Sequence, residues 1–285
     1  EMGVTESRIT FAAFDGVFGT GPTDVAARDM KIDGRIPIRV YRRRGEAEKP
    51  PVLVFFHGGG WVLGNLDTHD ALCRRLCNQA QCVVVSVDYR LAPEHVFPAA
   101  LDDCYQAVGY VASHGNELQI DPSRLIVAGD SAGGNLAAAV AIKARNESAA
   151  KILAQVLIYP VLDRDCDSAS YQALATGYGL TREDMRWFWK QYAGDVEGGV
   201  YLSPSQADSL RGLPPTVVIT AQYDVLRDEG EAFARQLTAA GVTVNHRRYD
   251  GAIHGFVHFA GAMDIGMRAT KEIAQDIRRL FEESN

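Results

Sequence analysis

The sequence LIVAGDSAGG, residues 125–134, decides the fold. It reads as a short buried strand over residues 125–128, followed at once by a Gly-x-Ser-x-Gly turn that opens a helix. Such a turn lifts the Ser131 hydroxyl above the edge of a sheet, and glycines on both sides let strand and helix approach closely. The alternative is that Ser131 only caps the helix. The Ala-Gly-Gly that follows lacks the acidic third residue of a strong serine cap, so we interpret Ser131 as a nucleophile.

Alternating strand and helix patterns extend this unit in both directions. The first two strands surround Asp33-Gly34, a hairpin-type turn, and most of the later ones are continuously apolar, as parallel strands covered on both faces are. The sequence therefore predicts an α/β fold with a mostly parallel, eight-stranded sheet and helices on both faces. We expect strands over residues 25–32, 36–42, 52–56, 83–87, 125–128, 155–162, 216–221 and 243–249, and helices over residues 67–80, 99–116, 133–145, 229–240 and 263–283.

One long connection interrupts the alternation. Residues 163–213 contain no strand pattern but include an aromatic helix over residues 182–192. A connection of this length in a single domain is typically a functional lid. We predict a cap insertion over residues 163–213, an N-terminal cap remnant over residues 1–24, and a catalytic domain formed by residues 25–162 and 214–285.

A second motif, His57-Gly58-Gly59-Gly60-Trp61, directly follows the strand over residues 52–56. Three consecutive glycines leave backbone N–H groups accessible, which is what an oxyanion hole requires. A flexible turn and a phosphate-binding loop are the alternatives. The phosphate loop is disfavoured because Trp-Val-Leu follows where Lys-Ser or Lys-Thr would be needed.

A serine nucleophile needs a histidine base, which in this fold follows it late in the chain. His254 lies in a loop just after the last predicted strand, at the sheet edge where a base must stand. His246 falls within that strand, and His258 lies in an apolar run typical of a packed or surface histidine. We therefore predict His254 as the base.

The base in turn needs a carboxylate that orients it. Asp224 follows the strand over residues 216–221 and is our candidate. Asp228 is one helical turn further on, where an acidic residue complements the helix dipole. Asp250 is close to His254 in sequence but is typical of a turn.

Together these motifs resemble one family, the hormone-sensitive-lipase-like carboxylesterases of the α/β-hydrolase fold, across nearly the whole chain from about residue 28. The resemblance rests on five blocks in the family's order: residues 57–60, 88–94 (DYRLAPE), 129–134, 224–230 and 254–256. Two departures are Val225, where the family usually has proline, and an N-terminal segment shorter than is usual.

The resemblance implies a Ser131–Asp224–His254 triad and an oxyanion hole formed by the N–H groups of Gly59, Gly60 and Ala132. It further implies hydrolysis of short- to medium-chain carboxylic esters through an acyl-enzyme, without cofactor or metal. The expected substrate-binding residues are Gly58, which shapes the loop, and the pocket residues Trp61, Met185, Phe188 and Phe256, whose alternative role is packing within the lid.

Two other functions compete with an esterase. A receptor-like, non-catalytic member of this fold is expected to lack the histidine that His254 provides. An amidase would need strong protonation of its leaving group and often a separate substrate-docking domain, and the sequence indicates neither. Both alternatives can be separated from an esterase by comparing the hydrolysis of matched esters and amides.

Charge and composition exclude other classes of function. The formal net charge is −7 and the sequence has no basic stripe, so we expect no nucleic-acid partner. No apolar run reaches the length of a membrane helix, and the opening residues EMGVTESRIT lack the pattern of a secretion signal. We therefore expect a cytoplasmic protein whose partner is a small-molecule ester.

The cysteines and the last strand carry two further expectations. Five cysteines without a Cys-x-x-Cys pair indicate buried free thiols, although Cys73 and Cys77 share a helix face that could offer two metal ligands. We expect neither a disulfide nor a metal. The last strand, near residues 242–249, is a candidate homodimer edge, unless Arg247 and Arg248 serve to blunt it.

Overall fold

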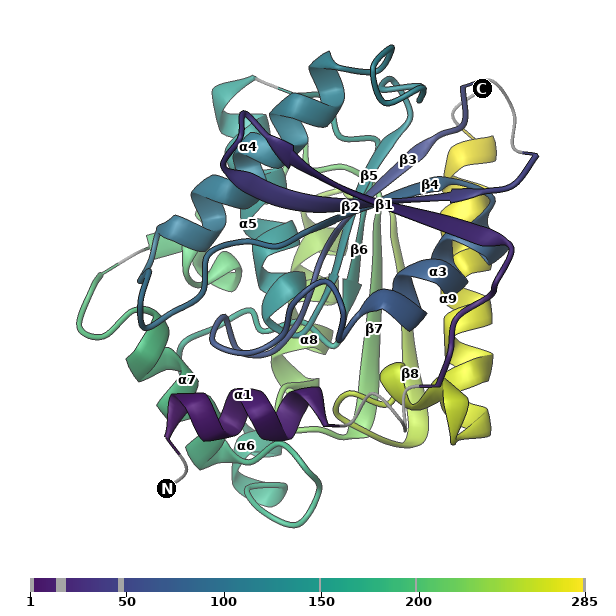
Figure 1. Ribbon diagram of the computed structural model, residues 1–285. Coiled ribbons are helices and arrows are strands. Elements are labelled where there is room, and N and C mark those ends of the chain that lie inside the picture. Colours follow the sequence, from purple (N-terminus) through teal and green to yellow (C-terminus); the bar gives the residue numbers. More distant parts are fainter. Residues whose placement is uncertain (1–2, 14–18, 46–48, 149, 198, 284–285) are drawn as a thin grey trace.

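Eight strands form one sheet at the centre of the protein (Figure 1). The computed structural model describes residues 3–13, 19–45, 49–148, 150–197 and 199–283. The strand order is β1-β2-β4-β3-β5-β6-β7-β8; β1 pairs antiparallel with β2 and β2 with β4, and all other pairs are parallel. The predicted sheet is therefore confirmed. The bounds are β1 Val25–Ile32, β2 Ile36–Arg43, β3 Val52–Phe56, β4 Val83–Val87, β5 Leu125–Asp130, β6 Ala154–Ile158, β7 Thr216–Tyr223 and β8 Val244–Ile253.

Two strands differ from the prediction in ways that matter for the site. Strand β6 ends at Ile158, not at residue 162, because Tyr159 has a positive φ of 34° and a proline follows it. Strand β8 extends to Ile253, four residues beyond the prediction, and resumes pairing with β7 after a bulge, where Tyr223 lies opposite Ile253. This extension brings the chain directly to His254.

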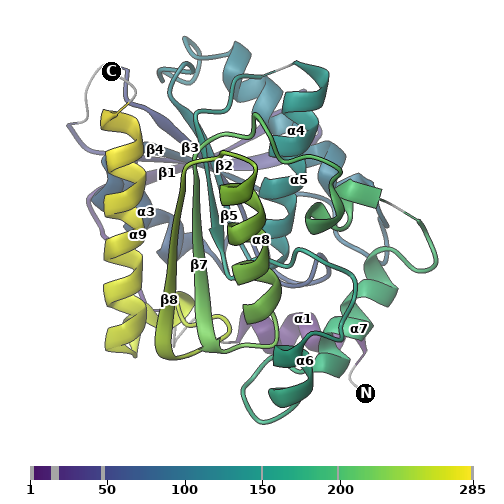
Figure 2. The same cartoon turned by 180° about the vertical axis from the view of Figure 1, so that it is seen from behind.

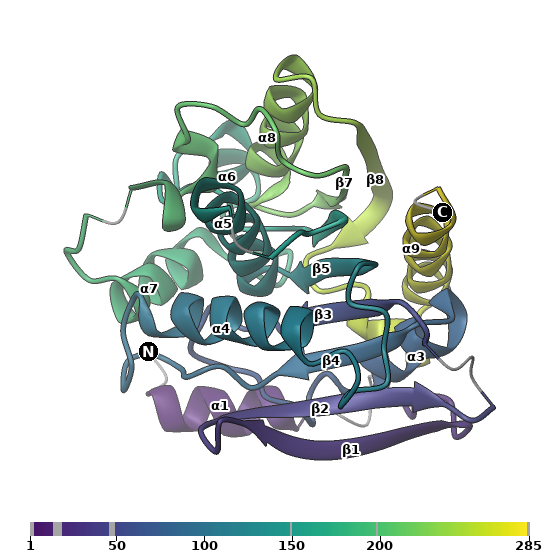
Figure 3. The same cartoon turned by 90° about the horizontal axis from the view of Figure 1, so that it is seen from above.

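Helices cover both faces of the sheet, as Figures 2 and 3 show. One face carries α3 (Asp70–Ala80) and α9 (Asp264–Glu282), and the other carries α4 (Ala99–Ser113), α5 (Ala132–Glu147) and α8 (Arg227–Ala239). Because strand side chains alternate between faces, they divide into two hydrophobic cores, one under each helix layer.

Side-chain hydrogen bonds explain where two helices depart from their predicted bounds. Helix α3 begins at Asp70 and not at residue 67, because the Asn65 side chain accepts the N–H groups of Asp67 and Thr68 and holds them in a turn. Helix α4 ends at Ser113 and not at residue 116. The Ser113 hydroxyl donates to the preceding carbonyls and the backbone at residue 114 leaves the helical region.

The segment predicted as a cap lies with the N-terminal helix at one end of the sheet (Figure 1). It contains α6 (Ala169–Ala173), α7 (Arg182–Tyr192) and two short 3₁₀ helices, Gly199–Tyr201 and Pro204–Gln206, while α1 spans Val4–Ala12. The bounds of α7 agree with the prediction, and a Thr181–Asp184 capping box fixes its start. Arg8 of α1 donates to the carbonyl oxygens of residues 62 and 92 and pairs with Glu94 at 2.7 Å. The division into a catalytic domain and caps stays a prediction.

Three smaller expectations concern the thiols, the membrane and the sheet edge. All five cysteines are buried, as predicted, no disulfide joins them in the described part of the chain, and burial raises the pKa of Cys73. No helix among the described residues is long and apolar enough to cross a membrane. Strand β8 does form a sheet edge, but Arg247 pairs with Asp276 of α9 at 3.1 Å. A homodimer through β8 stays a prediction.

Candidate active site

Ser131 stands at a sharp turn between β5 and α5. Its backbone angles are φ 56° and ψ −118°, and its N–H donates to the Ile158 carbonyl at 2.8 Å. A Cβ at Gly133 would collide with the Phe56 carbonyl oxygen, so only glycine permits this approach of α5 to the sheet. The side chain of Ser131 caps no backbone N–H of the helix, so its hydroxyl is available for another role.

The structure brings Ser131, His254 and Asp224 together. The Nε2 atom of His254 lies 3.0 Å from Ser131 Oγ, and its Nδ1 atom lies 2.7 Å from Asp224 Oδ2. Asp224 follows β7, and its other oxygen accepts the N–H of Leu226 at 2.9 Å. The His254 side chain keeps 14% of its surface exposed while that of Asp224 keeps 1%. The imidazole is therefore held by a buried carboxylate and remains accessible at the sheet edge.

The alternative bases and acids have other partners. His246 Nε2 lies 3.0 Å from the Thr220 hydroxyl, and burial lowers the pKa of His246. Asp228 accepts the N–H of Ser170, and Asp250 pairs with Arg248 at the surface. None of these three has a hydrogen bond to Ser131 or His254 among the described residues.

The glycine-rich loop over residues 57–61 is the predicted oxyanion loop. Gly59 and Gly60 have positive φ values of 108° and 60°, which favour glycine. Among the described residues, the N–H groups of Gly59, Gly60 and Ala132 meet no hydrogen-bond acceptor. A Cβ at Gly60 would collide with the ring of Phe188, so this half-buried ring of α7 lies directly against the loop.

The other predicted pocket residues are buried. Trp61 has no exposed surface and stacks on Tyr192 of α7, with ring centroids 4.4 Å apart and planes within 7°. Met185 is 1% exposed in the same core. Phe256 is fully buried in the other core, 5.1 Å from Tyr249 between ring centroids. The stacking of Trp61 on Tyr192 joins the oxyanion loop to α7, and contact of Met185 or Phe256 with a substrate stays a prediction.

Two arrangements near the site were missed by sequence reasoning. Ser170 of α6 donates its hydroxyl to the Val225 carbonyl at 2.6 Å, which fastens the cap to the loop that carries Asp224. The second involves Asp130, the residue before Ser131. Its carboxylate is buried with its oxygens on the Gly58 N–H (2.9 Å) and on His258 Nε2 (3.0 Å). Neither arrangement has a sequence signature, because the partners lie 55 to 128 positions apart.

The pKa of Asp130 reflects these neighbours. Burial alone would raise it, but His258 and His69 outweigh burial and hold the pKa of Asp130 well below its usual range. Asp130 is therefore a buried carboxylate anion immediately beside the proposed nucleophile.

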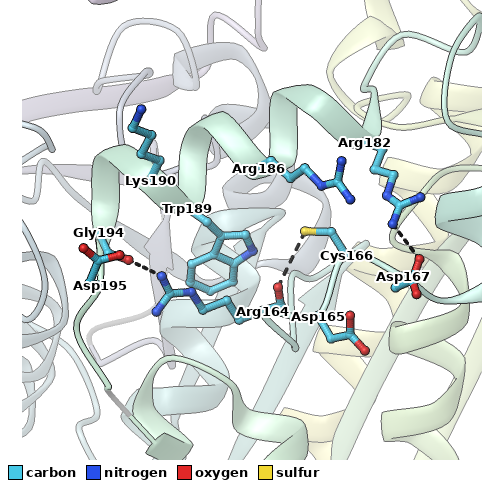
Figure 4. Close-up of a pocket in the computed structure, with 10 residues that line it drawn as sticks. All are labelled: Arg164, Asp165, Cys166, Asp167, Arg182, Arg186, Trp189, Lys190, Gly194 and Asp195. Carbon is cyan, nitrogen blue, oxygen red and sulfur yellow. Dashed lines mark hydrogen bonds and ion pairs between the residues drawn. The ribbon is translucent and has the colours of Figure 1, made fainter.

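A large pocket lies within the segment predicted as a cap. Its volume is about 740 Å³, and Figure 4 shows it between α7 and residues 164–167. Arg164 donates to the carbonyls of residues 194 and 196, and Arg182 pairs with Asp167 at 2.5 Å. Neither Ser131 nor His254 lines it, and its arginines fasten α7 to the start of the cap.

Comparisons with known proteins agree with this geometry. A family described by the alpha/beta hydrolase fold matches residues 53–258. The carboxylic ester hydrolase LipN of Mycobacterium tuberculosis is 43% identical over 265 residues, 89% of this chain and 70% of LipN. The carboxylesterase NlhH of the same species is 40% identical over 284 residues, 92% of this chain and 89% of NlhH.

A solved structure extends the likeness to three dimensions. The thermostable esterase from Pseudomonas putida superposes with a TM-score of 0.94 at 38% identity, covering 98% of this chain and 91% of that one. The chain therefore belongs to the α/β-hydrolase fold family and, within it, to the hormone-sensitive-lipase-like carboxylesterases, which makes it a carboxylic ester hydrolase.

Proposed function

We propose that this protein hydrolyses short- to medium-chain carboxylic esters by two-step acyl transfer, with Ser131 as nucleophile, His254 as base and Asp224 as orienting acid. The observation that carries the proposal is the unbroken contact from Asp224 Oδ2 to His254 Nδ1 and from His254 Nε2 to Ser131 Oγ, at 2.7 and 3.0 Å.

In the first step, Ser131 Oγ forms a bond to the ester carbonyl carbon while its proton moves to His254 Nε2. Asp224 holds the Nδ1–H of the ring and stabilises the imidazolium. The tetrahedral intermediate then expels the alcohol, which takes the proton from Nε2. Water repeats the sequence on the acyl-enzyme: His254 accepts its proton, the acid is released, and Ser131 recovers its hydrogen.

The negative charge of each tetrahedral intermediate needs hydrogen-bond donors. The N–H groups of Gly59, Gly60 and Ala132 support this role because they have no acceptor among the described residues and lie on segments next to Ser131. Each preorganised donor stabilises the transition state by roughly 3 kcal/mol.

The acyl group is proposed to lie beside Phe188, whose ring contacts Gly60 of the same loop. Trp61, which stacks on Tyr192 of α7, and Met185, which is buried in the same core, are proposed to set how far the pocket can extend. An aromatic wall this close to the oxyanion loop favours acyl chains of roughly two to eight carbons.

Hydrolysis of p-nitrophenyl esters with acyl chains of roughly two to twelve carbons tests the proposal, since kcat/KM against chain length reports pocket depth. We expect an optimum at the short end and a much slower reaction with the matched p-nitroanilides. Ser131→Ala is expected to lose activity by about 10⁶-fold while keeping the circular dichroism spectrum of the wild type.

Three results would contradict the proposal. A folded protein that turns over none of the esters would favour a receptor-like role, and faster cleavage of the anilides would favour an amidase. Near-normal activity of Ser131→Ala would place the nucleophile elsewhere.

A further inference from the structure

We propose that Asp130 is a positioning residue for the oxyanion loop: held between His69 and His258, its carboxylate fixes the backbone of Gly58 and so aims the N–H groups of Gly59 and Gly60. This inference rests on the proposed function and assigns no contact between Asp130 and the substrate.

Both backbone polar groups of Gly58, the N–H and the carbonyl oxygen, have side-chain partners. Its N–H donates to Asp130 Oδ1 at 2.9 Å and also faces His69 Nε2 at 3.2 Å. Its carbonyl oxygen lies 2.8 Å from His57 Nδ1. A Cβ at Gly58 would collide with the Asp130 carboxylate, so the carboxylate lies directly against the loop. Because Gly59 and Gly60 follow, the orientation of their N–H groups depends on this anchor.

Asp130 connects three of the segments that carry the proposed chemistry, those of the nucleophile, the base and the oxyanion donors. It precedes Ser131 in the chain, and one of its oxygens reaches the oxyanion loop 72 positions away. Its other oxygen is 3.0 Å from His258 Nε2, in the segment that follows His254. A shift of this carboxylate therefore displaces the nucleophile, the base and the oxyanion donors relative to one another.

The ring of His69 is fixed at both nitrogens. Its Nδ1 lies 2.9 Å from Thr68 Oγ1, and its Nε2 lies 3.2 Å from the Gly58 nitrogen and 3.3 Å from Asp130 Oδ1. Burial lowers the pKa of His69 and brings that of His57 to about 3.

The N–H of Gly58 argues against a metal ion between His69, Asp130 and His258. His69, Asp130 and His258 offer three ligand atoms within 4.8 Å of one another, a spacing that a cation could bridge. The Gly58 N–H, however, is directed at two of these atoms and would face the cation. The cluster is built to hold a backbone N–H.

A spectroscopic test reports on Gly58 directly. The sequence contains three His-Gly pairs, at Gly58, Gly115 and Gly255, so labelling histidine with carbonyl carbon-13 and glycine with nitrogen-15 isolates three amide signals. Asp130→Asn keeps the shape of the side chain but removes its charge. We expect the Gly58 amide proton to move upfield and to exchange about tenfold faster, because a charge-assisted hydrogen bond is lost. Gly115 serves as the internal control.

Kinetics with p-nitrophenyl butyrate test the effect on catalysis. Asp130→Ala is expected to lower kcat by about 100-fold, the effect of a lost oxyanion donor, with KM changed less than about threefold. His258→Gln, which keeps a donor near the Nε2 position, is expected to retain more kcat than His258→Leu. The matched control is Asp276→Asn, a buried aspartate of α9 paired with Arg247, which should leave kcat unchanged.

Each outcome decides the inference. It is overturned if Gly58 keeps its shift and exchange rate in folded Asp130→Asn, if Asp276→Asn loses as much kcat, if KM rises while kcat holds, or if dialysis of the wild type against a chelator removes activity. Should Asp130→Ala fail to fold, Asp130→Asn and the His258 pair decide it. A wild type without esterase activity refutes the proposed function instead, and the Gly58 signal still reports whether the anchor exists.

Discussion

Two aspartate–histidine pairs flank Ser131, and they are built alike. Asp224 and Asp130 each accept from an imidazole, at 2.7 and 3.0 Å, and each accepts one backbone N–H at 2.9 Å. The difference lies in the origin of that N–H. For Asp224 it comes from Leu226, two residues on, whereas for Asp130 it comes from Gly58, 72 residues away.

This difference gives the two aspartates different roles: Asp224 orients a base, and Asp130 holds a loop. The N–H of Leu226 holds one oxygen of Asp224 within its own loop, and the other oxygen orients His254, whose Nε2 reaches Ser131. Asp130 uses one oxygen to accept the N–H of Gly58 in the distant oxyanion loop, while its other oxygen faces His258. It therefore connects segments that are far apart in the sequence. A carboxylate and an imidazole thus support proton transfer at Asp224 and His254, and fix the oxyanion loop at Asp130 and His258. Four predictions test this division.

The largest effect is expected at the imidazole that faces Ser131. His254→Gln removes the proton acceptor and should lower kcat/KM of ester hydrolysis by about 10⁵-fold without unfolding the protein. His246→Gln, at an exposed histidine whose Nε2 lies 3.0 Å from the Thr220 hydroxyl, is the control and should stay within about threefold of wild type. Equal losses in both variants would remove His254 from the proposed mechanism.

The next effect concerns the acid. Asp224→Asn should lower kcat by about 10⁴-fold, because the amide favours the wrong tautomer of His254. Asp228→Asn should cost less than about tenfold, since Asp228 holds Ser170 of the cap and not the imidazole. Steady-state kinetics of the two purified variants give the ranking, and the reverse order would exchange their roles.

A smaller effect is expected where the oxyanion loop meets Asp130. Gly58→Ala should lower kcat by about 100-fold, because the new Cβ displaces the carboxylate that it meets. The same substitution should cost clearly less kcat in an Asp130→Ala background, where the Cβ has room. Fully additive losses in this double-mutant cycle would mean that the two residues act separately.

The smallest effect concerns Glu229, a buried carboxylate that accepts the backbone N–H of Leu162 at 2.7 Å and has no imidazole partner in the described part of the chain. Burial raises the pKa of Glu229 well above its usual range, opposite to Asp130. Folding then favours the protonated acid, so wild-type stability falls as the pH rises above the ordinary glutamate pKa. Glu229→Gln should therefore raise Tm by about 2–4 °C near pH 8, with the gain shrinking toward about pH 4.5.

Thermal melts across that pH range measure this gain. A constant difference between Glu229→Gln and wild type, or a gain that grows in acid, would show that the Glu229 carboxyl is not held in its protonated form.

Much of the sheet could be predicted from local sequence. The bounds of β1, β3 and β4 agree with the prediction because apolar or alternating runs end there at turn residues. The prediction failed at β6, where the apolar residues Val161 and Leu162 continue the pattern, although the backbone has already turned away at Tyr159. Apolar periodicity reports burial, and a buried turn carries the same signal as a buried strand.

Some residues of the candidate site could likewise be predicted from local sequence, and others could not. His254 and Asp224 could be proposed because each follows a strand, and the ends of parallel strands share one edge of the sheet. The anchoring by Asp130 could not, since it depends on three loops folding onto one carboxylate. The role of Phe256 stays a prediction, because an aromatic residue close to His254 gives the same sequence pattern whether it lines a pocket or packs in the core, where Phe256 is buried.

The backbone angle at Ser131 also restricts which nucleophiles this scaffold can carry. At φ 56° a β-branched side chain is strongly disfavoured, so threonine would bring an equivalent hydroxyl at the cost of the turn that presents it. Cysteine, with an unbranched Cβ, fits the same backbone. The backbone at position 131 therefore accepts serine or cysteine as the nucleophile and disfavours threonine, whatever acid and base stand beside it.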